Sequence, residues 1–315
     1  MLAEVKSPGR VDLDRLAGVL LEASDLDATR SFYERLFAGR SGQWQASKGR
    51  LVYEQDRETI GFIRRAPPRT LSDGGQHHGL RVPAGRIESL LRELEGAGCE
   101  IERWREDHPS ERQLSAYVCD PDGNRLQLVA AGEAGLLDHT AIEIHHFDYC
   151  EYLYVNVLGG RVDYYHGWRS TDIIEAQAWA AGGDPCAPWT RRDNPHYRDF
   201  LVADPVSGQL RPTRNSVGAG GGEGRLRVPR PNGQLFVAYG SGPYLVLVSA
   251  TAVRQQPREE QLEGTPRLVF GTRLSTGDVV DRLVQTPLPF QRGDGAVFVR
   301  DPDGNFCEVR CFANT

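Results

Sequence analysis

One five-residue motif occurs twice in the chain and constrains the fold more than any other feature. Asp120–Asn124 and Asp301–Asn305 both read Asp-Pro-Asp-Gly-Asn, about 180 residues apart. Proline restricts φ, aspartate and asparagine bind nearby backbone groups, and glycine accepts a positive φ, so the motif predicts a tight turn. An alternating apolar run typical of a strand follows each copy. The 315 residues are therefore predicted to form two homologous halves.

Each half divides again into two similar units. Tyr33 lies as far from Gly18 as Tyr154 lies from His139, and Asp25 or Asp27 could cap the first helix. Short alternating strands follow each helix. These patterns predict four βαβββ modules that begin near residues 16, 77, 138 and 266. Four segments share a strand followed by an amphipathic helix: residues 18–37, 77–98, 139–159 and 267–285.

A long insertion interrupts the third module, from about residue 168 to 232. A structureless loop of this length is unusual in a compact domain, which favours a functional lid or a partly disordered insertion. With a short linker between the halves, the prediction is an N-terminal domain of residues 1–133 and a C-terminal domain of residues 134–315, each with two modules.

Composition narrows the class of protein. A formal net charge of -6 argues against a nucleic-acid binder. No apolar run approaches the roughly 18 residues of a membrane span, and the first residues lack the apolar core of a signal peptide. We therefore expect a cytoplasmic protein without nucleic-acid or membrane partners. The six cysteines form no Cys-x-x-Cys pair, which favours reduced thiols over a zinc site or disulfides.

The opening strand and helix with Phe32 and Tyr33, the repeated turn and the four modules resemble the vicinal oxygen chelate superfamily, which includes glyoxalases, bleomycin-resistance proteins and extradiol dioxygenases. The resemblance implies an α+β fold of two domains with curled mixed sheets around a cavity. It implies a small-molecule substrate or ligand and leaves a homodimer open. The implied cofactor is a divalent metal, Fe(II), Mn(II), Ni(II) or Zn(II), or none.

The resemblance also carries over to single positions of the C-terminal half. His139 falls on the first metal-ligand position and Glu308 on the carboxylate position of the last strand. Arg267 stands where another ligand is expected, and as a partner of Glu308 it could instead grip a substrate anion or take part in catalysis. Glu143 and His145 share the face of His139 by strand alternation and could line the cavity, Glu143 in substrate binding and His145 in catalysis.

In the N-terminal half the resemblance leaves fewer ligands. His77 falls on a metal-ligand position, whereas Gly18 and Gln127 replace two other ligands. Both triads are therefore incomplete. Residues 297–308 also resemble the C-terminal motif of the extradiol dioxygenases, but Phe298 replaces its tyrosine and the upstream histidine falls near Gln291. Phe298 and Gln291 are then candidates for substrate binding, and ring cleavage is not favoured.

Three functions follow as hypotheses. The first is an enzyme, dioxygenase-like or a lyase or isomerase, that acts on a small oxygenated or aromatic substrate in the C-terminal cavity with an incomplete metal triad. The second is a metal-free protein that binds and sequesters a small molecule. The third is a metal-free enzyme that uses Arg267 and Glu308. The Gly-, Arg- and Ala-rich composition is typical of a high-GC genome and suggests a role in secondary metabolism.

Overall fold

The computed structural model describes residues 9–66, 76–104, 115–132, 135–144, 150–166, 201–203, 210–212, 234–249, 267–301 and 304–312. Within them the four predicted modules are present, each with an opening strand, a helix and three further strands. Most of the predicted insertion, and Cys186 with it, lies outside the described residues. Its described parts are β11 (Leu201–Ala203) and β12 (Leu210–Pro212), which pair with each other.

The elements of the first two modules are β1 (Arg15–Ala23), α1 (Leu26–Leu36), β2 (Gln43–Ser47), β3 (Arg50–Gln55) and β4 (Glu58–Arg64), then β5 (His77–Pro83), α2 (Ile87–Gly96), β6 (Ile101–Trp104), β7 (Ser115–Cys119) and β8 (Arg125–Ala131). Those of the last two are β9 (Leu137–Ile144), η1 (Tyr152–Val157), β10 (Arg161–His166), β13 (Gln234–Ala238) and β14 (Tyr244–Ser249), then β15 (Arg267–Thr272), α7 (Thr276–Leu283), β16 (Phe290–Arg292), β17 (Ala296–Arg300) and β18 (Phe306–Cys311).

Local signals explain the helix ends. The Asp25 side chain caps α1 by accepting hydrogen bonds from the backbone nitrogens of Asp27 and Ala28, so the first of the two predicted caps is confirmed. Gly98 follows α2 with φ of 86°, a left-handed conformation that favours glycine and ends the helix. The helix of the third module is a π-helix, η1, with Leu153, Tyr154 and Val157 buried.

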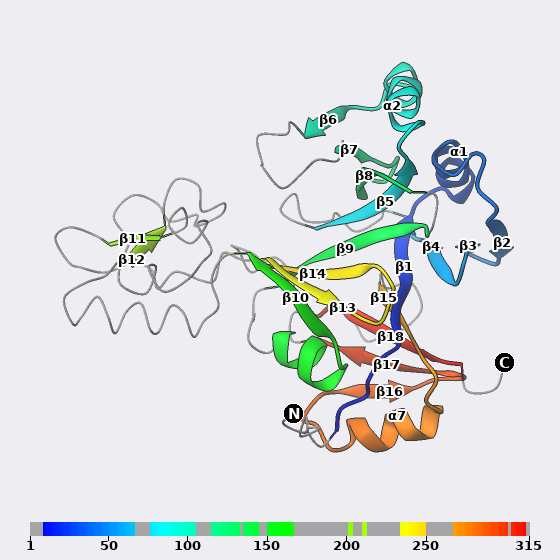
Figure 1. Cartoon of the computed structure of the whole chain (residues 1–315). Coiled ribbons are helices and arrows are strands. Elements are labelled where there is room, and N and C mark those ends of the chain that lie inside the picture. The colour runs from blue at the N-terminus through cyan, green and yellow to red at the C-terminus, as the bar shows by residue number, and fades with distance from the viewer. Residues whose placement is uncertain are drawn as a thin grey trace.

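Two mixed eight-stranded sheets carry the fold (Figure 1). Sheet A has the order β16-β17-β18-β15-β1-β4-β3-β2, and sheet B the order β10-β13-β14-β9-β5-β8-β7-β6. In each sheet two modules meet through their opening strands, which pair antiparallel. Both sheets are open rather than closed into barrels, which confirms the predicted α+β class with four modules.

The sheets combine modules from opposite halves of the chain. Sheet A joins the first module to the fourth, and sheet B joins the second to the third. The opening strands therefore pair between the two halves of the chain and not within them. The repeat identifies equivalent strands, but four similar opening strands present similar edges, so local patterns do not say which two pair. The division of the chain at residue 133 stays a prediction.

The two repeated turns fasten the modules within each half. The Tyr33 hydroxyl donates to Asp120 Oδ2 at 3.2 Å, and the Tyr154 hydroxyl donates to Asp301 Oδ2 at 3.0 Å. All four side chains are buried. The asparagine of each turn reaches the opening strand of the preceding module: Asn124 Nδ2 donates to Glu22 O at 3.2 Å, and Asn305 Nδ2 to Glu143 O at 3.4 Å. Turns thus join modules within a half, and strands join modules across halves.

Two further observations bear on the expectations from composition. No helix among the described residues combines the length and apolar character that crossing a membrane requires. The five described cysteines are free thiols: Cys99, Cys119, Cys150, Cys307 and Cys311.

Candidate functional site

Two histidines from different modules meet on one face of sheet B. His77 opens β5 and His139 lies in the adjacent β9, where Gly79 is directly opposite His139. Side chains two residues apart on a strand point to the same face, so residues 77 and 79 share one face of the sheet. Because His139 is directly opposite Gly79, both histidine rings project from that face. His77 Nε2 and His139 Nε2 are 2.9 Å apart, and the ring planes are nearly perpendicular at 84°.

A carboxylate behind His139 fixes the orientation of its ring. Asp138 Oδ2 accepts a hydrogen bond from His139 Nδ1 at 2.9 Å, and Arg81 Nε lies 3.3 Å from the other carboxylate oxygen. Burial acts to raise the pKa of Asp138, but the hydrogen bond from His139 and the charge of Arg81 outweigh it, so this pKa is lowered. With Nδ1 donating to a carboxylate, the neutral ring presents an unprotonated Nε2 towards His77.

A glycine makes room for the His139 ring. A Cβ atom on Gly79 would lie 2.5 Å from both Cε1 and Nδ1 of His139, which shows that the ring lies across the strand at this point. The next residue in the same row, on β8, is Gln127. Its Nε2 donates to Ser115 Oγ at 3.3 Å. Among the described residues no group donates a hydrogen bond to the side-chain amide oxygen of Gln127, so this oxygen is available to a ligand.

The donor set suits a divalent first-row metal. Imidazole nitrogens bind such ions at about 2.0–2.1 Å, so two of them at a right angle stand about 2.9 Å apart, as His77 and His139 do here. An amide oxygen from Gln127 would be a third donor. No group of three or more His, Cys, Asp or Glu side chains suited to a metal occurs among the described residues.

Aromatic side chains flank the histidine pair. The Tyr117 ring contacts His77 edge to face at 5.4 Å, and the Arg125 guanidinium lies 4.2 Å above the Tyr117 ring. On the other side, Tyr244 is directly opposite His139 in the neighbouring strand and contacts Phe236 at 6.2 Å. The face therefore offers ring surfaces on both sides of the paired imidazoles.

Residues 15–128 match the family model described as Glyoxalase/Bleomycin resistance protein/Dioxygenase superfamily. The match covers the first two modules of the chain, which are therefore similar to this superfamily. The comparison with curated proteins found no match.

Solved structures share the fold over nearly the whole chain. Glyoxalase I from Zea mays aligns with a TM-score of 0.57 and 12% identity, covering 94% of this chain and 92% of that one. A putative dioxygenase from Bacillus subtilis aligns with a TM-score of 0.57 and 11% identity, covering 95% of this chain and 86% of that one. At this identity the likeness shows the fold alone.

The superfamily's ligand positions in sheet A hold other residues. Gly18 lies within β1 and Arg267 opens β15, and an apolar cluster of Ala17, Leu20 and Val269 is buried in the same sheet. A Cβ atom on Gly61 would collide with Leu20 Cδ2. Sheet A thus has aliphatic side chains in the region where sheet B has imidazoles.

The structure separates the two residues on which the sequence prediction of a C-terminal metal site rests. His139 lies in sheet B and Glu308 in sheet A, so the predicted convergence of these two side chains was wrong. Glu308 is buried at 8% exposure and accepts a hydrogen bond from Arg310 Nε at 2.8 Å. Arg267 opens β15, but its side chain lies outside the described residues.

The remaining predicted residues are spread over both sheets. Glu143 is half-buried in β9, and its backbone carbonyl binds Asn305. Phe298 is opposite Glu308, and Gln291 is exposed opposite Phe298. His145 lies outside the described residues. Neither Phe298 nor Gln291 is on the sheet of the histidine pair.

Sequence reasoning missed the contributions of Asp138, Gly79 and Gln127 to this site. His77 and His139 had been placed at equivalent positions of two modules, and knowledge of the module pairing would have brought them together. Gln127 had been identified as the replacement of a carboxylate ligand. The side-chain amide of glutamine keeps one oxygen atom, and this oxygen could have indicated a weaker metal ligand at position 127.

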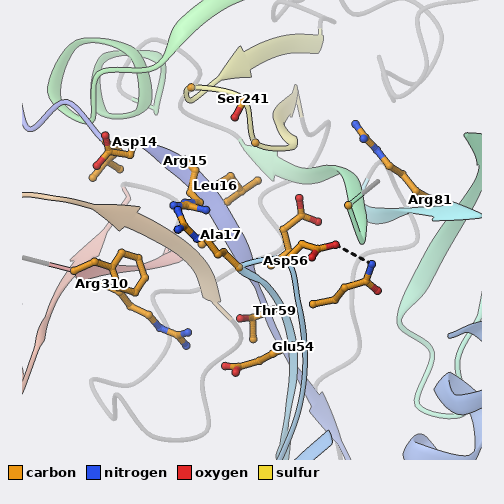
Figure 2. Close-up of a pocket in the computed structure, with 18 of the residues that line it drawn as sticks. Asp14, Arg15, Leu16, Ala17, Glu54, Asp56, Thr59, Arg81, Ser241 and Arg310 are labelled. Atoms are coloured by element: carbon orange, nitrogen blue, oxygen red, sulfur yellow. Dashed lines mark hydrogen bonds between the residues drawn. The ribbon is translucent and has the colours of Figure 1, made fainter. Parts of the chain in front are cut away.

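A cavity of about 1650 Å³ lies away from the histidines (Figure 2). Its wall includes the ends of β1, β3, β4 and β18 of sheet A, together with the turn between β13 and β14. The cavity and the histidine pair are therefore two different candidate sites. Among the described residues, the lining of the cavity includes no histidine or cysteine, so the histidine pair on sheet B is the better candidate for binding a first-row metal.

Proposed function

We propose that the chain is a metal-dependent enzyme of the superfamily, with His77, His139 and Gln127 holding one divalent ion of Fe, Mn, Ni or Zn on sheet B. The observation that carries the proposal is the 2.9 Å separation of the two Nε2 atoms, with Asp138 fixing the His139 ring from behind. The ion, when bound, would act as a Lewis acid on oxygen atoms of the substrate.

The surrounding side chains support a small aromatic or oxygenated substrate. Tyr117 stands beside His77, and Tyr244 with Phe236 stands beside His139, so a planar molecule could stack against either ring surface. Glyoxalase I and a putative dioxygenase share the fold, which is consistent with a lyase, isomerase or oxidoreductase reaction. A cytoplasmic location and a role in secondary metabolism remain part of this proposal.

The test is the metal content of protein purified without chelator, measured by elemental mass spectrometry. We expect about one divalent ion per chain in the wild type and less than about a tenth of that in the His77→Ala, His139→Ala double variant, since first-row metals need more than one amide ligand. Glu308→Gln is the matched control because it alters the predicted carboxylate ligand in sheet A, and it should leave the metal content unchanged.

The opposite pattern would overturn the proposal. Metal that is lost in Glu308→Gln but kept in the double histidine variant would move the site to sheet A. A wild type that remains metal-free after anaerobic reconstitution would favour the second candidate, a metal-free protein that binds a small molecule. The mutual contact of His77 and His139 and the aromatic surface beside them favour that candidate, because neither feature needs an ion. A metal-free enzyme using Arg267 and Glu308 stays a prediction.

A further inference from the structure

We propose that the cavity at sheet A is a second, metal-independent binding site that takes the carboxylate or phosphate group of a small molecule between Arg15 and Arg310. The two arginines lie in one row across three adjacent strands. Arg15 on β1 is opposite Gly271 on β15, which is opposite Arg310 on β18. Directly opposite residues share a face, so both arginines project from the same side of the sheet.

One strand separates the two arginines, and the Phe312 ring packs over its residue Gly271. Strands are about 4.8 Å apart, so the Cα atoms of Arg15 and Arg310 are separated by about 10 Å. The Phe312 ring and the Cγ atom of Arg15 lie 2.7 Å and 3.4 Å from where a Cβ of Gly271 would be. Figure 2 shows Arg15 and Arg310 in the wall of the same cavity.

Among the described residues, both guanidinium groups have donors without an acceptor. Arg310 donates through Nε to Glu308, and within the described residues its two terminal nitrogens have no recorded acceptor. The Arg15 side chain has no recorded hydrogen bond or ion pair in that same part of the chain. A half-buried guanidinium without acceptors is costly, which an oxyanion would offset.

Acidic side chains that line the cavity already accept hydrogen bonds from other groups of the protein. Asp14 accepts hydrogen bonds from the side chain and the backbone nitrogen of Arg273. Glu58 accepts from the backbone nitrogens of Leu136 and Leu137. Arg15 and Arg310 line this cavity, and their two planar groups could each bind a carboxylate or phosphate in bidentate fashion.

The floor of the site is apolar. Leu16, Ala17 and Phe312 line the cavity beside the arginines, and Phe312 is 42% exposed. A ligand with one oxyanion and a small apolar body would match both features. Since these positions hold no imidazole, the site is expected to work without metal and independently of sheet B.

Binding can be measured by isothermal titration calorimetry at constant ionic strength, with inorganic phosphate as one probe and benzoate as the other. We expect saturable binding of at least one probe to the wild type and at least a tenfold weaker affinity in Arg15→Gln and in Arg310→Gln. Arg273→Gln is the matched control, because Arg273 also lines the cavity but is paired with Asp14 and 89% exposed. It should bind within about twofold of the wild type.

Each outcome decides the proposal. Preference for phosphate or for benzoate identifies which oxyanion the site takes. No saturable binding of either probe, or equal loss in Arg273→Gln, would overturn it. If a glutamine variant fails to fold, Arg15→Lys and Arg310→Lys keep the charge but lose the fork, and they should still weaken binding. The His77→Ala, His139→Ala double variant should bind the probe like the wild type, and loss there would contradict a separate site.

Discussion

Replacing Gly79 with alanine is expected to lower the affinity of the sheet B site for a divalent metal by about 100-fold, while the protein stays folded. The added Cβ would lie 2.5 Å from two atoms of the His139 ring, so the ring must rotate away. It would then lose its alignment with His77 Nε2 and with Asp138. Competition with a chromophoric zinc chelator measures the affinity directly, without an assay of activity.

The control for this prediction is Gly85→Ala, because a Cβ there meets no atom within 4 Å. Its metal affinity should equal that of the wild type. Equal affinities in wild type and Gly79→Ala would mean that the His139 ring is not a ligand in the orientation described. Loss of thermal stability in Gly79→Ala without loss of metal affinity would assign the glycine a packing role alone.

Replacing Asp120 with alanine is expected to cost about 3 kcal/mol or more of unfolding free energy. Its buried carboxylate accepts hydrogen bonds from the backbone nitrogens of Asp122 and Asn124, from Asn124 Nδ2 and from the Tyr33 hydroxyl. Alanine leaves these donors without their acceptor and loosens the turn that holds the first module to the second. Equilibrium unfolding in urea measures the change.

Tyr33→Phe is the matched variant because it removes only one of those donors. The remaining bonds to Asp120 persist, so the expected loss is about 1 kcal/mol. A larger loss in Tyr33→Phe than in Asp120→Ala would show that the tyrosine is held by packing and that the carboxylate contributes little to the turn.

The pH dependence of stability in wild type and Asp120→Ala tests the role of Asp120 independently. Burial raises the pKa of Asp120 to about 6, against hydrogen bonds from Asn124 and Asp122 that act to lower it; the ordinary value is 3.8. An acid with a higher pKa in the folded state binds more protons there, so acidification stabilises the fold. Between pH 7 and pH 5 the stability difference between wild type and Asp120→Ala should widen by about 1 kcal/mol. A difference that narrows would contradict the raised pKa.

The two sheets show how one module can serve different chemistry. The same opening-strand position holds His77 and His139 in sheet B, and Gly18 and Arg267 in sheet A. In sheet B, Gly79 keeps the space beside the imidazoles free of side chains. In sheet A, the equivalent position is Leu20, which fills the space at Gly61.

The sequence by itself determined the modules and their local chemistry. The repeated turn, the helix cap at Asp25, the glycine stop at Gly98 and the equivalence of Tyr33 with Tyr154 depend on residues close together in the chain or on a copied pattern. Such features follow from backbone preferences and short-range hydrogen bonds, so they can be predicted without a structure.

Only the tertiary structure decided which modules share a sheet, and with it which ligands meet. His139 had been assigned to Glu308 because both lie in the C-terminal half, but β9 pairs with β5, which brings His139 to His77 and moves Glu308 to Arg310. Strand pairing between distant segments depends on the packing of the whole chain, because each opening strand offers similar backbone donors and acceptors to any partner. For that reason local sequence could identify the candidate ligands but not their combination.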